Sequence, residues 1–191
     1  MLLFARTARQ ALEREGFRVV MTRNDDSDPS YDDRAALANS YRDVIFVSFH
    51  ISSTGTLHTA RAYSYKFPDP LPDATNPNTG AASTIPHSAK TSLPAWEGAQ
   101  RPYADASQSL ANLVQTELAQ RYPGSPSASS TAAVRGLRSV GAPAIAVEVS
   151  NIAVSNPNEL IEMAAPVSTA IVHSIVASRP AAGSIVAPEP K

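Results

Sequence analysis

Two almost uninterrupted apolar segments constrain the fold of this chain more than any other feature. Residues 44–49 (Val-Ile-Phe-Val-Ser-Phe) and residues 144–147 (Ala-Ile-Ala-Val) lack the alternation of apolar and polar positions that marks a half-exposed strand. Such runs are typical of strands buried on both faces, as in parallel sheets covered by helices. Helical and extended patterns alternate around them. The sequence therefore predicts an α/β layered fold, with a mostly parallel central sheet flanked by helices.

The other elements follow from the spacing of apolar side chains. Helical spacing begins near Phe4 and ends at Gly16, a residue suited to a helix stop. Further helices are predicted at residues 32–41, 105–122 and 158–178, the last kinked or restarted at Pro166. Short strands are predicted at residues 17–21 and 62–67.

Proline is unevenly distributed along the chain. Only Pro29 precedes residue 68, whereas a dense group follows at positions 68, 70, 72, 77, 86, 94 and 102. Because proline fixes φ and lacks a backbone donor, residues 67–103 are predicted to form a long loop inserted into the domain. Residues 123–132 form a second predicted flexible segment. A single domain is expected over residues 1–179, followed by a disordered tail at residues 180–191.

Composition excludes several classes of function. Lys and Arg number 16 against 17 Asp and Glu, so the chain has no strongly basic field, and no nucleic-acid partner is expected. The absence of cysteine excludes disulfide scaffolds, thiolate zinc sites and cysteine nucleophiles. No apolar run approaches the roughly 18 residues of a membrane span, and no signal peptide is predicted. No glycine-rich phosphate loop supports a nucleotide cofactor.

The two apolar segments each lead directly into an ionisable side chain. Residues 44–49 are followed by His50, and residues 144–147 by Glu148. In open α/β sheets, functional groups collect beyond the carboxyl ends of the strands. There an imidazole can bind a metal and a carboxylate can act as a general base. The alternative is that each residue caps a neighbouring helix or simply faces water.

A succession of short motifs around these residues resembles the zinc-dependent N-acetylmuramoyl-L-alanine amidases, which cleave bacterial peptidoglycan. The early motifs are Thr22-Arg23, Asp26, Arg34, Ala38-Asn39, Asp43 and Ser48-Phe49-His50. The later ones are Ser109-Leu110-Ala111, Arg135-Gly136-Leu137, the run from Pro143 to Glu148, and Ser155-Asn156-Pro157. The resemblance extends from about residue 8 to residue 177, and it rests on the order of many motifs rather than on any single one.

The resemblance implies specific roles. His50 matches a Zn²⁺-ligand histidine of the family, and Glu148 matches the catalytic glutamate that activates zinc-bound water. The bond attacked is the amide between the lactyl group of muramic acid and L-alanine. A Lewis-acid metal would polarise the carbonyl while the carboxylate transfers the proton. Arg23, Arg34 and Asn39 are expected to order loops and helix ends. Peptidoglycan is the implied partner, and the periplasm or cell envelope is the implied location.

The departures from the family pattern concern the metal. The family's domain opens with a strand and a "GHGG"-like turn carrying the first zinc histidine, and a glutamate follows as second ligand. Here the sequence begins within the helix that comes next, so of the three ligands only His50 is expected. Neither His58, His87 nor His173 is expected to replace the other two. Ile51-Ser52 and Val149-Ser150-Asn151 also differ from the residues that usually follow the two site residues.

Three hypotheses follow for this chain. The first is an amidase whose sequence, as given, lacks the opening strand. This hypothesis predicts little or no zinc-dependent hydrolysis by the 191-residue chain. The second is a shortened, metal-free relative that acts as a peptidoglycan-binding or regulatory module. The third is a non-enzymatic α/β domain related by descent alone. Loss of an interior strand is also expected to leave backbone groups unpaired, which predicts marginal stability or self-association.

Overall fold

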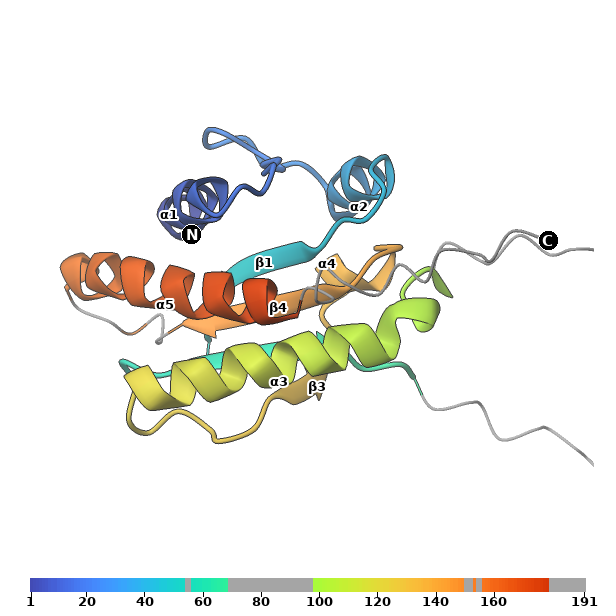
Figure 1. The fold of residues 1–191 in the computed structure, drawn as a ribbon. Helices are drawn as coiled ribbons and strands as arrows, with labels where there is room; N and C mark the ends of the chain where they lie inside the picture. Colours follow the sequence, from blue (N-terminus) through green and yellow to red (C-terminus); the bar gives the residue numbers. More distant parts are fainter. Residues whose placement is uncertain (54–55, 69–97, 150–152, 154–155, 179–191) are drawn as a thin grey trace, which may run out of the picture.

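The computed structural model describes residues 1–53, 56–68, 98–149, 153 and 156–178. Its centre is a sheet of 4 strands in the order β1-β4-β2-β3 (Figure 1). The strands are β1 (Phe46–Ile51), β2 (Ala60–Tyr65), β3 (Ser130–Ala132) and β4 (Ala144–Val149). The pairs β1–β4 and β2–β3 are parallel, whereas β2 and β4 are antiparallel. The predicted α/β layers and mostly parallel sheet are therefore confirmed, and the sheet is mixed.

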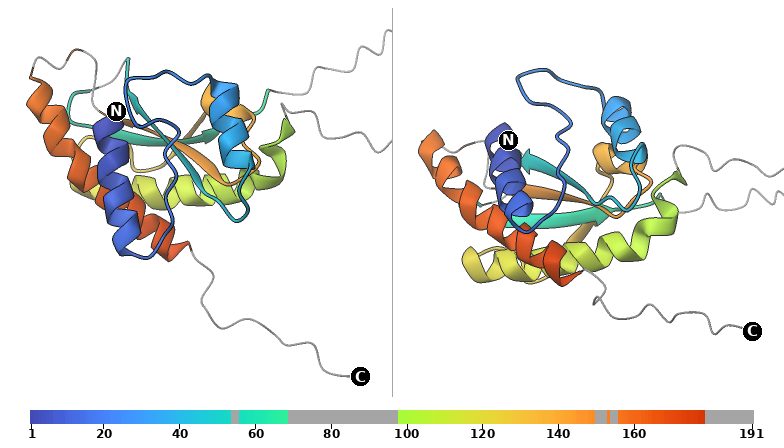
Figure 2. Two further views of the ribbon diagram at one scale, coloured as in Figure 1. Left: turned by 90° about the horizontal axis from the view of Figure 1, so that it is seen from above. Right: turned by 45° about the horizontal axis from the view of Figure 1, so that its top comes forward.

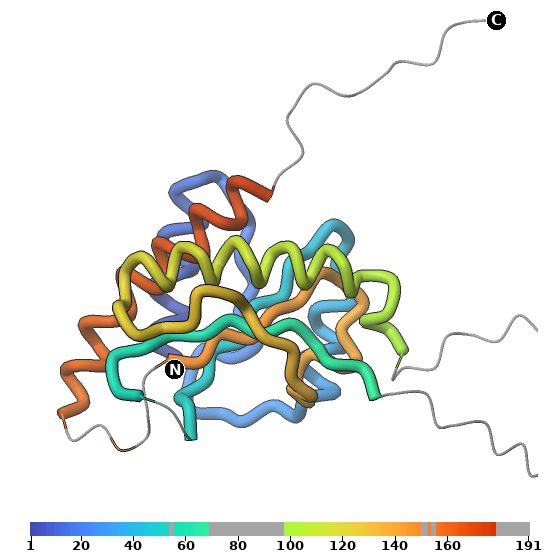
Figure 3. The backbone as a smooth tube through the Cα atoms, turned by 90° about the horizontal axis from the view of Figure 1, so that it is seen from below, coloured from blue at the N-terminus to red at the C-terminus, as the bar shows by residue number. Residues whose placement is uncertain are grey.

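Helices cover both faces of this sheet. They are α1 (Leu2–Arg14), α2 (Tyr31–Asn39), the 3-10 turn η2 (Arg101–Tyr103), α3 (Ala104–Arg121), α4 (Arg135–Arg138) and α5 (Pro157–Ala177). One apolar cluster joins α1, α3 and α5 to the sheet, and a second joins α2 and α4 to the opposite face. Helices α1 and α5 lie side by side, and α3 runs along β2 and β3 (Figures 2 and 3).

Strand β4 shows why its sequence is apolar throughout. Ile145, Val147 and Val149 belong to the cluster with α1, α3 and α5, while Ala144 and Ala146 belong to the cluster with α2 and α4. All five side chains are buried. Glu148 follows Ala144 and Ala146 in the alternation along β4, so its side chain lies on the same face of the sheet as theirs. Helices α2 and α4 cover this face near the start of β4, whereas Glu148 lies near the end of the strand.

Two sequence predictions were wrong in detail. Residues 17–21 form no strand, because within the described chain no backbone ladder joins them to β1. Residues 130–132 of the predicted flexible segment form β3, which pairs with β2. Helix α5 continues through Pro166, so of the two predicted alternatives, a kink or a restart, the restart does not occur. Its buried residues on both sides of the proline, Met163 and Val167 among them, share one core, and their burial offsets the lost backbone hydrogen bond.

Much of the predicted insert lies outside the described residues, as do His87 and the predicted tail at residues 180–191. The end of the insert is described, and it packs into the domain. Gln100 is fully buried, and its side-chain amide donates hydrogen bonds of 2.7 Å to the carbonyls of both Val140 and Ala142. Its carbonyl accepts a 2.6 Å hydrogen bond from Ser107. These contacts fix the chain before α3 against the start of β4.

Helix α5 is the one helix in the described part of the chain that is long and apolar enough to cross a membrane. The sequence led us to expect no apolar segment of the length of a membrane span, and by length and composition α5 differs from that expectation. However, 50% of its most apolar stretch is buried inside the protein. Val167, Ala170 and Ile171 lie in the core cluster. Core helices pass the same test, so this property alone is weak evidence for a membrane span.

Candidate active site

His50 and Glu148 lie side by side at the carboxyl ends of two parallel strands. His50 on β1 and Glu148 on β4 are Cα partners in the register of the pair. Side chains at paired positions of neighbouring strands project from the same face, with the strands about 4.8 Å apart. Both residues are partly buried. The structure thus brings together the two residues that the sequence singled out, although no local pattern links one to the other.

Strand β2 completes this face on the far side of β4. Arg61 is the register partner of Glu148, and Tyr63 is the partner of Ala146. The Arg61 guanidinium donates a 3.3 Å hydrogen bond to the Tyr63 hydroxyl and lies over the Tyr63 ring, 6.0 Å from its centre. Burial raises the pKa of Tyr63, and the neighbouring Glu148 carboxylate adds to that increase. Glu148 therefore has an imidazole on one side and a guanidinium and phenol on the other.

The environment of His50 favours its neutral form. Burial lowers the pKa of His50, and the Arg34 guanidinium lowers it further. The Glu148 carboxylate acts in the opposite direction without reversing the net effect. Nε2 of His50 lies 2.8 Å from the Ser48 hydroxyl, which stands two positions earlier on the same face of β1. A neutral imidazole is the form that binds metal ions.

Arg34 and Asn39 hold the segments around this site, as the sequence predicted. Nε of Arg34 donates to the Pro29 carbonyl at 2.9 Å, and its other nitrogens contact Thr22 at 3.2 Å and Asp28 at 3.0 Å. Asn39, at the end of α2, donates to the Ser139 carbonyl at 2.9 Å and accepts from the Gly141 amide at 2.7 Å. Asn39 thereby fixes α2 to the loop that leads into β4.

Arg23 has a more local role. Its guanidinium donates a 3.0 Å hydrogen bond to the Ser27 carbonyl, which closes the turn before α2. This contact confirms the predicted ordering of a loop.

The residues that the structure describes do not fit a catalytic zinc ion. Such a site takes three protein ligands and leaves a fourth position for water. No group of three His, Asp or Glu side chains that could hold a metal occurs among the described residues. His58 instead lies 3.3 Å from Glu159 at the start of α5. His173 lies 3.6 Å from Glu117, between α5 and α3. Of the His, Asp and Glu residues that the structure describes, His50 and Glu148 are the pair that meets at the strand ends.

Comparison with known proteins decides the family. The family model described as N-acetylmuramoyl-L-alanine amidase matches residues 1–177 of the chain. The chain belongs to this amidase family. By family it is a hydrolase that acts on amide bonds of peptidoglycan, and the family is zinc-dependent and active on the cell wall. The sequence-based resemblance is confirmed. The search of curated proteins gave no match.

Solved amidases share the fold of this family member. An N-acetylmuramoyl-L-alanine amidase from Clostridium difficile 630 is 21% identical with a TM-score of 0.59, covering 92% of this chain and 80% of that one. AmiC2 of Nostoc punctiforme is 19% identical with a TM-score of 0.61, with the same coverage, 92% and 80%. Ami1 from Mycobacterium smegmatis is 23% identical with a TM-score of 0.57, covering 92% and 73%. At these identities the likeness establishes the fold alone.

Sequence reasoning missed Arg61 and Tyr63. The alternation in residues 60–65 (Ala-Arg-Ala-Tyr-Ser-Tyr) separates a small, buried series from a polar and aromatic one, and it could have identified the exposed face. It could not have identified β4 as the neighbour, because β2 pairs with a strand far away in the sequence and runs antiparallel to it.

Proposed function

We propose that this chain carries a partial peptidoglycan amidase site, in which His50 and Glu148 are the groups that face the substrate's amide bond. The reaction of the complete site is hydrolysis of the bond between the lactyl group of muramic acid and L-alanine. The observation that supports this assignment is the register pairing of His50 with Glu148 at the open ends of β1 and β4. It gives a neutral metal-binding group and an adjacent carboxylate, on a fold shared with amidases.

We further propose that the chain by itself hydrolyses this bond slowly or not at all. Among the described residues the site has one imidazole and one carboxylate, fewer groups than the three ligands and separate base that zinc-dependent amide hydrolysis requires. His58 and His173 are paired with other carboxylates on the surface, at Glu159 and Glu117. The proposed residual role of Glu148 is therefore to orient a substrate or a water molecule.

The test measures metal content and hydrolysis on the same purified chain. After dialysis against Zn²⁺ and gel filtration, we expect far less than one zinc per chain, unchanged in His50→Ala. The unaltered chain should release the L-alanyl peptide from a muramoyl tripeptide no faster than the Glu148→Gln variant does. Stoichiometric zinc that disappears in His50→Ala, together with hydrolysis that disappears in Glu148→Gln, would overturn the proposal of an incomplete site.

A non-catalytic role in binding peptidoglycan is the second candidate, and Arg61 favours it. Arg61 is exposed beside Glu148, and its guanidinium lies over an aromatic ring, an arrangement suited to the carboxylates of stem peptides. Co-sedimentation with purified sacculi tests this role. We expect Arg61→Ala to reduce the bound fraction and Arg14→Ala, at an exposed position on α1, to leave it unchanged. Absence of co-sedimentation by the unaltered chain removes this candidate.

The location follows from the substrate. A protein that acts on or binds peptidoglycan must reach the cell envelope, so we propose the periplasm or cell wall as its site of action. Fractionation of cells carrying an epitope-tagged chain, with a cytoplasmic marker followed in parallel, measures this directly.

A further inference from the structure

Arg61 is a charged side chain beside the candidate site that the proposed chemistry leaves unused. It lies on β2 as the register partner of Glu148, which is itself the register partner of His50 on β1. Its neighbours Ala60 and Ala62 are buried in the apolar cluster with α1, α3 and α5. Because side chains alternate along a strand, Arg61 projects from the opposite face, which also carries Glu148. Arg61 is exposed on that face.

Arg61 does not form an ion pair with Glu148. Opposite charges at register-partner positions are placed for such a pair. However, Arg61 takes part in no ion pair among the residues that the structure describes. Its guanidinium instead donates a 3.3 Å hydrogen bond to the Tyr63 hydroxyl and lies over the Tyr63 ring. The Glu148 carboxylate is close enough to the same phenol to raise its pKa. Tyr63 thus holds the guanidinium beside Glu148 without direct pairing of the two charges.

This arrangement leaves donors of Arg61 for an external anion. A guanidinium presents several N–H donors in a planar fork, which fits a carboxylate with parallel hydrogen bonds. Within the part of the chain that the structure describes, the bond to Tyr63 is the one hydrogen bond that the Arg61 side chain donates. Stacking over the Tyr63 ring fixes the plane of the fork, so less conformational freedom is lost when an anion binds.

The spacing of the strands indicates which part of a substrate reaches Arg61. His50 and Arg61 are two strand spacings apart, about 10 Å between their Cα atoms. One residue of an extended peptide spans about 3.5 Å, and its side chain adds further reach. A peptide whose scissile amide lies over His50 and Glu148, and which extends across β2, therefore brings the residue after L-alanine to the Arg61 guanidinium.

We propose that Arg61 selects peptides with a free carboxylate on the residue that follows L-alanine, in preference to the corresponding carboxamide. The inference rests on the proposed amidase site, since it requires the scissile amide to lie over His50 and Glu148. A carboxylate accepts charge-assisted hydrogen bonds from both arms of the fork, whereas a carboxamide offers one neutral oxygen acceptor. Arg61 also offsets the repulsion between this carboxylate and Glu148. Without Arg61 the preference should therefore disappear.

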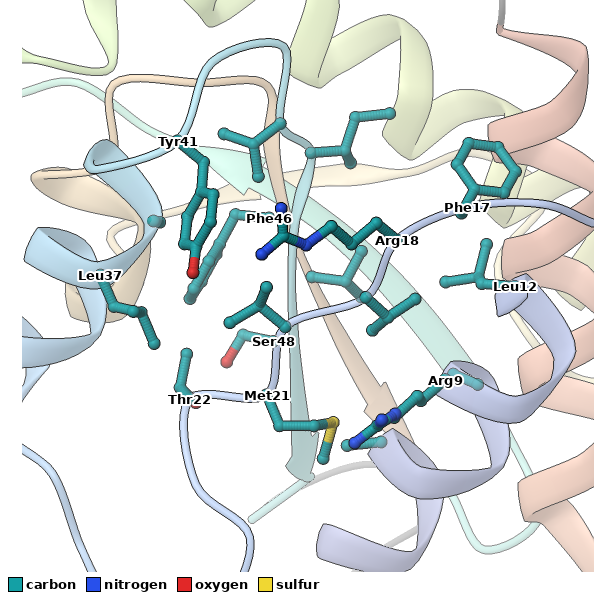
Figure 4. A pocket seen from close by; sticks show the side chains of 18 of the residues that line it. Arg9, Leu12, Phe17, Arg18, Met21, Thr22, Leu37, Tyr41, Phe46 and Ser48 are labelled. Atoms are coloured by element: carbon teal, nitrogen blue, oxygen red, sulfur yellow. The ribbon is translucent and has the colours of Figure 1, made fainter.

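Arg18 provides a matched control on another part of the molecule. It is likewise an exposed arginine with its guanidinium over an aromatic ring, 5.7 Å from the centre of Tyr41. Figure 4 shows this pair at a pocket on the side of β1 away from β4. Neither Arg61 nor Glu148 lines that pocket. Loss of Arg18 thus removes the same kind of stacked charge without a change beside Glu148.

The experiment uses the full chain and two synthetic peptides, lactyl-L-alanyl-glutamate and lactyl-L-alanyl-glutamine. Both have an amidated carboxyl terminus, so they differ by a single charge. NMR titration near neutral pH gives the dissociation constant of each peptide, and the imidazole signals of His50 report whether the lactyl–alanine end reaches the site. We expect the glutamate peptide to bind about fivefold more tightly. Arg61→Gln should remove this difference, whereas Arg18→Gln should preserve it.

Two conservative variants test how Arg61 is held. Arg61→Lys keeps the charge but lacks the planar fork, so it should retain only part of the preference. Tyr63→Phe removes the hydroxyl that accepts the Arg61 hydrogen bond, which allows the guanidinium to pair with Glu148. The preference for the glutamate peptide should then fall toward equality. A full preference in Tyr63→Phe would contradict the role assigned to the Tyr63 hydroxyl.

This inference and the proposed function fail in different ways. If both peptides shift the His50 signals with equal dissociation constants, the selectivity assigned to Arg61 is wrong, and the placement of the amide stands. If the glutamate peptide binds through Arg61 without a shift at His50, the placement of the amide is wrong, and Arg61 remains a carboxylate site. A preference that persists in Arg61→Gln, or no binding of the glutamate peptide at millimolar concentration, overturns the inference.

Discussion

His50 on β1 and Glu148 on β4 are direct register partners across a parallel strand pair. This relationship gives each residue its chemical surroundings. The carboxylate stabilises a proton on the imidazole, while burial and Arg34 oppose it, and the net result is a pKa of His50 below the usual value of 6.5. The pair therefore presents a neutral imidazole next to a carboxylate near neutral pH.

The first prediction concerns the contributions of the two charged neighbours to His50. In metal-free buffer, Arg34→Met should raise the pKa of His50, because a positive charge that opposes protonation is removed. Glu148→Gln should lower it further, because the favourable negative charge is lost. NMR titration of the imidazole carbon-bound protons measures both. The exposed His173 gives a reference signal in the same spectra, and shifts of the same sign in the two variants would contradict the assigned causes.

The second prediction follows from the same lowered pKa. The unfolded chain takes up a proton on His50 near pH 6.5, before the folded chain does. The stability that His50 contributes is therefore complete above that pH and is lost as the pH falls through the lower pKa of the folded state. Urea denaturation at a series of pH values should show this loss, and His50→Gln should reduce its slope.

A separate loss of stability is expected at lower pH. Hydrogen bonds from Ser27 and Ser30 lower the pKa values of Asp25 and Asp33, respectively, below 3.8. Their contribution is present above that value and is lost as the pH falls further. His50→Gln should leave this lower window unchanged, which separates the two effects in one experiment.

The third prediction concerns the buried amide of Gln100. Gln100→Ala leaves the carbonyls of Val140 and Ala142 and the Ser107 hydroxyl without their side-chain partner. Each unsatisfied buried group costs about 1–3 kcal/mol, so we expect a loss of about 2–4 kcal/mol in the free energy of unfolding. Gln120→Ala, at an exposed position on α3, is the matched control. A loss equal to that of the control would show that water replaces these hydrogen bonds.

The fourth prediction concerns alkaline stability. Burial raises the pKa of Tyr122 to about 12, and its hydroxyl donates a 3.2 Å hydrogen bond to the Met163 carbonyl. The unfolded chain loses this proton near pH 10, so the contribution of Tyr122 is complete below that pH and is lost as the pH rises toward 12. Thermal melts between these values should show a smaller decline in Tyr122→Phe. Tyr31→Phe, at an exposed position, should behave like the unaltered chain.

The sequence predicted correctly the strands that helices cover on both faces. It failed where the pairing of one strand with another decides the structure. The run ending in Glu148 is apolar because β4 is covered on both faces, so its pattern alone identifies a strand. Residues 17–21 have the composition of a strand, but no ladder of backbone hydrogen bonds joins them to a strand in the described structure, and composition carries no information about which strands pair.

The residues of the candidate site could be predicted from the sequence, but their arrangement in space could not. His50 and Glu148 were identified from their positions after apolar runs and from the family motifs. Their pairing depends on a register between strands distant in the chain, and the approach of Arg61 depends on β2 running antiparallel to β4. Both are set by the packing of whole elements, which a single sequence does not encode in any local pattern.

The position of β1 at the end of the sheet also has a dynamic consequence. Glu148 stands on a strand held by ladders on both sides, whereas in the part of the chain that the structure describes His50 stands on a strand with a ladder on one side. Local opening is easiest where the fewest hydrogen bonds must break. Transient release of β1 would therefore carry the imidazole away from the carboxylate while β4 stays in place. Whatever steadies this outer strand also sets the fraction of time for which the two groups face one another.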